Sequence, residues 1–91
     1  MFKVWGKLIK DNEIIKAFDV ENITELSFEE KRNSAFEEIC YHFDLSVPVW
    51  LDKHTKDFIS FKRATFYPED FIEEFIYDRM EFDLVKWDDK K

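Results

Sequence analysis

The sequence has few residues that can form disulfides, bend the backbone sharply or make it flexible: its 91 residues include one cysteine, two prolines and one glycine. Because Cys40 has no second cysteine to pair with, a secreted scaffold held by internal disulfides is excluded. Because Gly6 is alone, a glycine-rich phosphate-binding loop is excluded too. No glycine- or serine-rich linker divides the chain, so we expect a single domain at residues 1–87 and a frayed charged tail at residues 88–91.

Long hydrophobic runs and clusters of basic residues are also missing. The first residues alternate apolar and basic side chains, unlike the apolar core of a signal peptide, and no run approaches the ~20 apolar residues of a membrane span. The net charge is −7, whereas phosphate backbones and anionic membranes attract clustered Lys and Arg. We therefore expect a cytoplasmic protein that binds neither nucleic acid nor membranes directly.

Aromatic residues are abundant instead: the chain has eleven Phe, three Trp and three Tyr. Each ring can bury roughly 150–250 Å², so a core built from these rings can hold so small a domain together. We accordingly expect neither a structural metal nor a cofactor.

The N-terminal residues alternate in the manner of two strands, 2–10 and 13–20, joined by a two-residue turn at Asp11 and Asn12. In a regular register, both faces of this hairpin are partly apolar. Either a bulge near Ile14–Ile15 re-aims the second strand, which we favour, or both faces are covered, one by helices and one by a partner or second copy.

Three helix starts follow the hairpin. A capping box at Ser27, followed by apolar residues at helical spacing, predicts a helix over 28–43. Asp52 is expected to cap a shorter helix over 52–61. Pro68 suits the first position of a further helical turn.

A final strand is predicted over 77–87. If it lies beside the first strand, Glu81 and Asp83 lie across from Lys3 and Lys7, which would place opposite charges together. The expected fold is α+β: a three-stranded antiparallel sheet, made of the N-terminal hairpin and the C-terminal strand, with one main helix and one or two short helices on one face.

The sequence offers weak candidates for a metal site and none for a catalytic one. Cys40 lies on the apolar stripe of the main helix, so we expect it in the core rather than as a reactive thiol. Glu38 and His42 share a helix face and could ligate a divalent metal with His54 or Asp44. A solvated Glu–His pair is the simpler interpretation.

Asp52, His54 and Thr55 offer a carboxylate, a base and a hydroxyl. At this spacing they are typical of a helix N-terminus rather than of a nucleophilic triad.

Four aromatic residues are hard to bury together in one small core, namely Trp5, Trp50, Tyr67 and Trp87. Tryptophan and tyrosine are enriched in protein interfaces because they join a large apolar area to a polar tip. These four are our candidates for partner binding, with Trp5 and Trp87 forming a patch beside the sheet. The alternative is a small core whose aromatic residues extend to its rim.

The chain combines several distinctive stretches: VWGKLIKDN at 4–12, EEICYHFDLS at 37–46, WLD at 50–52, and residues 68–72 before an acidic terminal strand. With them the chain resembles a group of short uncharacterised proteins from anaerobic Gram-positive bacteria. The resemblance implies a bacterial cytoplasmic setting and brings no activity or functional residue. Tyr67 stands where that group tends to have a small polar residue, which leaves the start of the helix at Pro68 open.

Three functions remain compatible with the sequence. The first is a non-enzymatic protein-interaction module, binding a protein partner or a second copy of itself. The second is an acidic decoy that mimics nucleic acid through helix 28–43. The third is a small metal-dependent enzyme using Glu38, His42 and His54.

Overall fold

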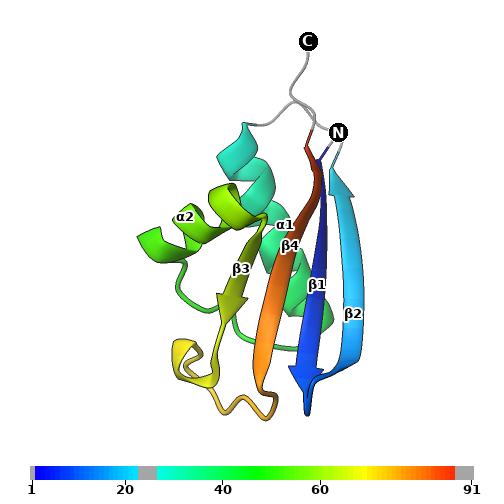
Figure 1. Cartoon of the computed structure of the whole chain (residues 1–91), viewed down its shortest axis with the longest axis vertical. Coiled ribbons are helices and arrows are strands. Elements are labelled where there is room, and N and C mark those ends of the chain that lie inside the picture. Colours follow the sequence, from blue (N-terminus) through cyan, green and yellow to red (C-terminus); the bar gives the residue numbers. More distant parts are fainter. Residues whose placement is uncertain (1, 23–26, 88–91) are drawn as a thin grey trace.

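The computed structural model describes residues 2–22 and 27–87 (Figure 1). The predicted tail at 88–91 lies outside these residues. The elements follow the order β1 (Phe2–Lys10), β2 (Glu13–Asn22), α1 (Phe28–His42), α2 (Asp52–Phe61), β3 (Arg63–Phe66), the 3₁₀ helix η1 (Pro68–Asp70) and β4 (Arg79–Trp87).

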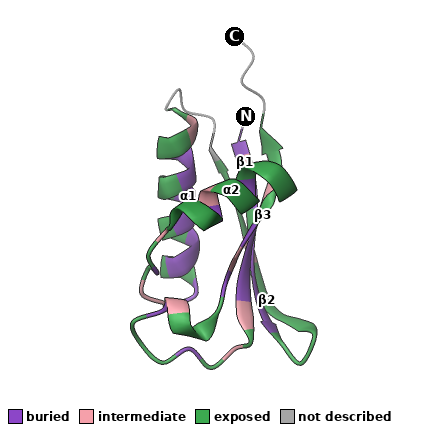
Figure 2. Ribbon diagram, turned by 60° about the vertical axis from the view of Figure 1, so that its left-hand side comes forward, coloured by how far each residue is buried: buried purple, intermediate pink, exposed green. Residues whose placement is uncertain are grey.

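The strands form one antiparallel sheet in the order β2-β1-β4-β3, and both helices cover the same face of it (Figures 1 and 2). The expected α+β class and the pairing of the last strand with the first are confirmed. The expected number of three strands is wrong, because Arg63–Phe66 adds a fourth strand at the edge beyond β4. Four residues are too few for alternation to stand out from a loop.

The hairpin forms as the turn chemistry predicts. Asp11 and Asn12 have φ of 55° and 65°, the left-handed values that a tight hairpin turn requires. The register shifts between Leu8 and Ile9, so that Ile15 is left without a partner on β1. The favoured bulge is thus confirmed. It moves Phe18 to the helix side of the sheet, where its ring stacks on His42 of α1.

The start of α1 is fixed by the capping box: the Glu30 amide donates to Ser27 Oγ, and the Ser27 amide donates to the Glu30 carboxylate. The helix ends at His42, one residue before the predicted end. Its buried face carries Ala35, Phe36, Ile39 and Cys40.

The remaining predicted elements are present with small changes. The cap of α2 is Leu51 rather than Asp52, which already lies in the first turn; the Leu51 amide donates to Nδ1 of His54. The turn at Pro68 begins where expected, and the Tyr67 amide donates to Asp70 Oδ2. β4 begins at Arg79, two residues later than predicted.

The core lies between the sheet and the two helices (Figure 2). Phe2, Phe58, Phe66 and Phe82 are fully buried in it, together with Cys40, as predicted for that thiol. Gly6 lets α1 approach β1 closely, because a Cβ at this position would overlap Cγ2 of Ile39.

Among the residues described, no helix combines the length and the apolar character that crossing a bilayer requires.

Candidate interaction surface

The sheet face opposite the helices, here called the open face, is not covered by any described part of the chain. Cross-strand partners in a sheet project to the same side. The register therefore assembles this face from all four strands: Lys3, Trp5, Lys7 and Ile9 of β1, Ile14, Ala17, Asp19 and Glu21 of β2, Arg79, Glu81 and Asp83 of β4, and Arg63 and Thr65 of β3.

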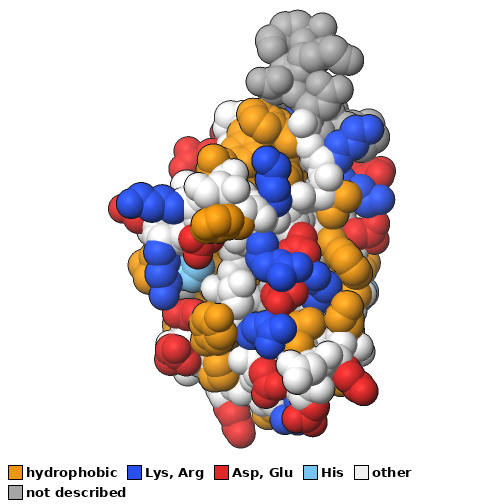
Figure 3. Space-filling view, in the orientation of Figure 1, with side chains coloured by type: hydrophobic (Ala, Val, Ile, Leu, Met, Phe, Trp, Pro, Cys, Tyr) orange, Lys and Arg blue, Asp and Glu red, His pale blue; other side chains and the backbone are white. Residues whose placement is uncertain are grey.

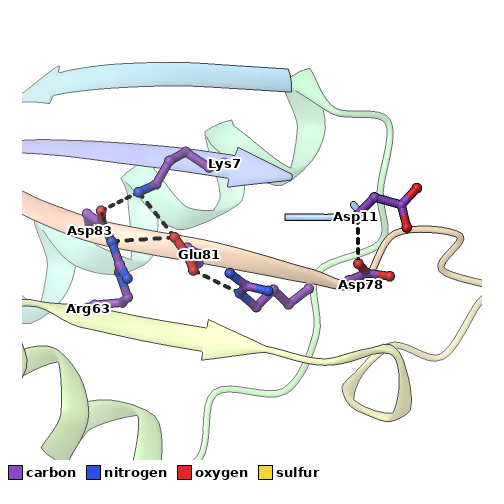
Figure 4. Close-up of polar contacts among 7 residues, drawn as sticks. Lys7, Asp11, Arg63, Asp78, Glu81 and Asp83 are labelled. Atoms are coloured by element: carbon purple, nitrogen blue, oxygen red, sulfur yellow. Dashed lines mark hydrogen bonds and ion pairs between the residues drawn. The ribbon is translucent and has the colours of Figure 1, made fainter. Parts of the chain in front are cut away.

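Five charged residues form a central cluster on the open face (Figure 4). The Lys7 ammonium lies 3.1 Å from a Glu81 oxygen and 2.8 Å from an Asp83 oxygen. Arg63 bonds both oxygens of Asp83, at 2.7 and 3.1 Å, and also reaches Glu81 at 3.4 Å. Arg79 bonds the second Glu81 oxygen at 2.9 Å. The central cluster thus joins three strands through side chains as well as through the backbone.

The middle of this cluster is shielded from water although no helix covers it. The side chains of Lys7 and Glu81 are only 6% and 8% exposed. Trp5 contributes to the shielding, since the Lys7 ammonium lies 4.4 Å from the centre of its ring. The charges therefore pair in a partly dry setting, where each hydrogen bond is stronger than in bulk water.

The electrostatics of the cluster keep both carboxylates charged. Burial alone raises the pKa of Glu81, but hydrogen bonds from Arg79 and Lys7 and the charge of Arg63 outweigh it, so the pKa lies below its ordinary value. Asp83 behaves alike: burial opposes ionisation, while bonds from Arg63 and Lys7 lower its pKa. Neither carboxylate is poised to exchange a proton near neutral pH, so the cluster is suited to a structural or binding role.

Every ion pair found in residues 2–22 and 27–87 lies on the open face. Besides the central cluster, Lys3 approaches Asp19 and Glu21 of β2 at 3.5 and 3.8 Å. The paired set contains four cations and four carboxylates, so its charges cancel. The acidic excess of the chain is thus carried elsewhere.

Apolar side chains border these charges, as Figure 3 shows for this side of the molecule. Trp5 is 36% exposed and Val85 is 52% exposed. Together with Lys3 and Asp19 they line a shallow groove of about 190 Å³. The open face therefore offers an aromatic anchor beside a rigid, neutral charge network.

The structure separates the four aromatic candidates. Trp5 lies on the open face. Trp87 packs on Phe28 of α1, with ring centres 4.4 Å apart, so the predicted patch of Trp5 with Trp87 does not form. The physical reason is strand register: Trp87 pairs with Phe2 and so projects to the helix side.

Of the other two aromatic candidates, Trp50 lies in the core rim and Tyr67 follows the end of β3. Trp50 belongs to the rim of the core, where it contacts the rings of Phe36, Phe66 and Phe82, and its Nε1 donates to Thr55 Oγ1 at 2.7 Å. Tyr67 is 46% exposed, next to η1.

The weak metal candidates are not brought together. Glu38 and His42 lie on the exposed side of α1, and the His42 ring stacks on Phe18 at 3.7 Å. His54 is buried in α2, with Nδ1 occupied by the Leu51 amide. In the described part of the chain, no three His, Cys, Asp or Glu side chains are grouped to hold a metal ion.

The remaining chemical candidates have structural surroundings. Burial raises the pKa of the Cys40 thiol to about 12, so it is not a reactive nucleophile. Thr55 accepts from Trp50, as part of the first turn of α2 with Asp52 and His54.

Sequence reasoning identified the pairing of Lys7 with Glu81 and Asp83 but missed that Arg63 and Arg79 join the cluster. Lys3 was expected to join it and instead pairs with β2. Arg63 was missed because its strand was missed. The sequence offers only the alternation of Arg63 and Thr65 with apolar Ala64 and Phe66, which is too short to distinguish a strand from a loop.

A second hollow lies on the helix side, between α1 and the segment that follows it. It measures about 520 Å³ and is lined by Ser34, Glu37, Glu38, Tyr41, Leu45, Ser46 and Val47. It is acidic, unlike the open face.

Comparisons with protein-family models, with curated proteins and with solved structures find no match to this chain.

Proposed function

We propose that this chain is a non-enzymatic protein-interaction module that binds a protein partner through the open face. The observation that carries the proposal is the central cluster, whose charges are mutually paired and whose middle, Lys7 with Glu81 and Asp83, is largely out of water before any partner arrives. Many antiparallel sheets have one solvent-exposed face, so an exposed face alone does not indicate binding. The central cluster on that face is what supports this function.

Burying charged groups under a partner normally costs free energy, because water is removed from them. Here most of that desolvation has already occurred in the free chain, since the Lys7 and Glu81 side chains are less than a tenth exposed. A partner that covers the middle of the cluster therefore loses little, while the Arg63 and Arg79 side chains are still 45% and 32% exposed and can face the partner. Trp5 and Val85 then supply the apolar contact area from which binding energy comes.

A cytoplasmic setting belongs to the same proposal. It is supported by Cys40, which is a free thiol. Thiols are kept reduced in the cytosol, whereas small secreted domains commonly depend on disulfides.

The test is affinity capture from a lysate of the source cells with three baits: the natural chain, Trp5→Ser and Tyr41→Ser. Tyr41 is the matched control, an aromatic residue 87% exposed on α1. We expect the partner, a second copy included, to be retained by the natural chain and Tyr41→Ser and reduced at least about tenfold by Trp5→Ser. Equal capture by all three baits would contradict the proposal.

A second candidate is the acidic decoy. It is favoured by the exposed side of α1, where Glu29, Glu30, Glu37 and Glu38 make no ion pair with any described residue. A partner held there by charge is released as salt rises, whereas a partner on the internally paired open face is retained. The salt dependence of capture separates the two functions.

A further inference from the structure

We infer that the open face binds a second copy of this chain, related to the first by a twofold axis that runs parallel to the strands between β1 and β4. This inference rests on the proposed function and names its partner. It is carried by the order in which the strand register places charges across the sheet.

One row of the open face shows this order. The register aligns Asp19 of β2 with Trp5 of β1, Trp5 with Asp83 of β4, and Asp83 with Arg63 of β3. The row therefore has a carboxylate at one edge and a guanidinium at the other. These are also the charges that remain open to water, with side chains 58% exposed for Asp19 and 45% exposed for Arg63.

A twofold axis along the strands reverses the strand order of the second copy, so that β2 of one copy lies over β3 of the other. Packed sheets lie about 10 Å apart with strands aligned within about 30°. Asp19 then faces Arg63 of the second copy, and Lys7 faces the other Glu81. The rotation generates each contact twice, as a symmetric interface requires.

The next row supports the same axis on steric grounds. Ala17 of β2 pairs with Lys7, Lys7 pairs with Glu81, and Glu81 pairs with Thr65 of β3. The same axis therefore brings Ala17 over Thr65 of the second copy. Both side chains are short, so they do not hold the two sheets apart where β2 crosses β3.

An axis perpendicular to the strands gives the opposite result. It lays β2 over β2 and β3 over β3 with the strand direction reversed, so an axis level with Trp5 brings Asp19 over the other Asp19 and Arg63 over the other Arg63. Like charges placed opposite one another oppose association. The exposed charges therefore select the axis parallel to the strands.

Net charge favours this face over the rest of the surface. The whole chain carries −7, so two copies repel one another wherever their acidic surfaces meet. The ion-paired residues of the open face carry no net charge, and two copies can approach through them with the least repulsion.

The test combines mass and cross-linking. Light scattering after size exclusion is expected to give a mass twice that of the 11.2 kDa chain. Ala17→Cys and Thr65→Cys are then made separately, in a chain whose own Cys40 is fully buried. A short bis-maleimide is expected to cross-link the mixture of the two variants.

Each variant alone is the control. In the proposed dimer the two Ala17 positions lie three strand spacings apart sideways and one sheet spacing apart in depth, about 17 Å in all, and so do the two Thr65 positions. We therefore expect little cross-linking from either variant alone.

Asp19→Arg, which opposes Arg63 of the second copy with a like charge, is expected to weaken the dimer at least about tenfold, whereas Asp57→Arg on α2 leaves it unchanged.

Two results would overturn the inference: a monomer at every concentration that stays soluble, or cross-linking of Ala17→Cys by itself. The first leaves the proposed function standing if Trp5→Ser still loses a different protein partner. If Trp5→Ser changes neither the mass of the chain nor any captured protein, the proposed function fails as well.

Discussion

Lys7 is the residue on which the open face depends most, because its ammonium group joins the two buried carboxylates Glu81 and Asp83. We expect Lys7→Met to lower the free energy of unfolding at pH 7 by about 2 kcal/mol, less than the loss of a sole partner, since Arg63 and Arg79 still pair with the carboxylates. Urea unfolding measures the change.

Lys3→Met is the matched control, on the same strand and the same face. Its side chain is 33% exposed and its carboxylate partners more so, so the expected loss is below about 1 kcal/mol.

The pKa values of Glu81 and Asp83 are lowered on folding, so the stability that their ionised forms contribute is present above their ordinary pKa values and lost as pH falls. The effect of Lys7→Met should therefore shrink in acid; an effect equal to that of Lys3→Met at pH 7 would refute a buried network.

His54 makes the free energy of unfolding depend on pH in a range above the one in which Glu81 and Asp83 titrate. Burial lowers the pKa of its imidazole below the ordinary value of about 6.5, and the charge of Asp70 opposes this only in part. Nδ1 accepts from the Leu51 amide, so a proton added there breaks that bond. Because the folded pKa is lower than the unfolded one, this contribution is complete above about pH 6.5 and is lost as pH falls below it.

The corresponding experiment follows unfolding free energy from pH 7.5 to pH 5.0. The natural chain is expected to lose stability across this range. His54→Gln keeps a hydrogen-bond acceptor without a titrating group, so its curve should be flatter. A curve for His54→Gln as steep as that of the natural chain would assign the loss to another group.

At the scale of elements, the contact between β1 and α1 is set by Gly6. A Cβ there would overlap Cγ2 of Ile39, whose side chain is fully buried. We expect Gly6→Ala to destabilise the fold by roughly 1–3 kcal/mol through overpacking. Ile39→Leu removes the methyl group in question at equal volume, so the double variant should lose less than the sum of the two single losses in thermal unfolding. Strict additivity would show that the two residues do not meet.

The elements that sequence reasoning placed well are those specified by neighbours in the chain. The capping box at Ser27 and the left-handed turn at Asp11 and Asn12 involve residues at most three positions apart. The fourth strand, Arg63–Phe66, has no such local signal. It exists because Ala64 and Phe66 bury against the core and because β4 offers a free edge.

At the scale of the whole molecule, net charge governs association. Two chains of −7 repel one another at long range, and the Debye length falls from about 30 Å at 0.01 M salt to about 8 Å at 0.15 M. The charges of the central cluster are paired within each chain and partly shielded from solvent. Salt also screens the two exposed Asp19–Arg63 contacts between the copies, but these are fewer than the excess acidic charges of the two chains, so we expect added salt to strengthen the dimer, as measured by sedimentation equilibrium, whereas a charge-held decoy complex weakens. A dimer that dissociates on adding salt would contradict an interface with neutral paired charges.

The sequence by itself determined the α+β class, the main helix and its cap, the hairpin turn, and the core position of Cys40. Each of these follows from periodicity or from contacts between near neighbours. It also indicated that Lys7 meets Glu81 and Asp83, since opposite charges alternate along two candidate strands. Only the tertiary structure decided that Arg63 joins them, that Lys3 does not, and that Trp5 and Trp87 lie on opposite faces. Those outcomes depend on strand order and register, and a bulge of one residue reverses which face every later side chain reaches.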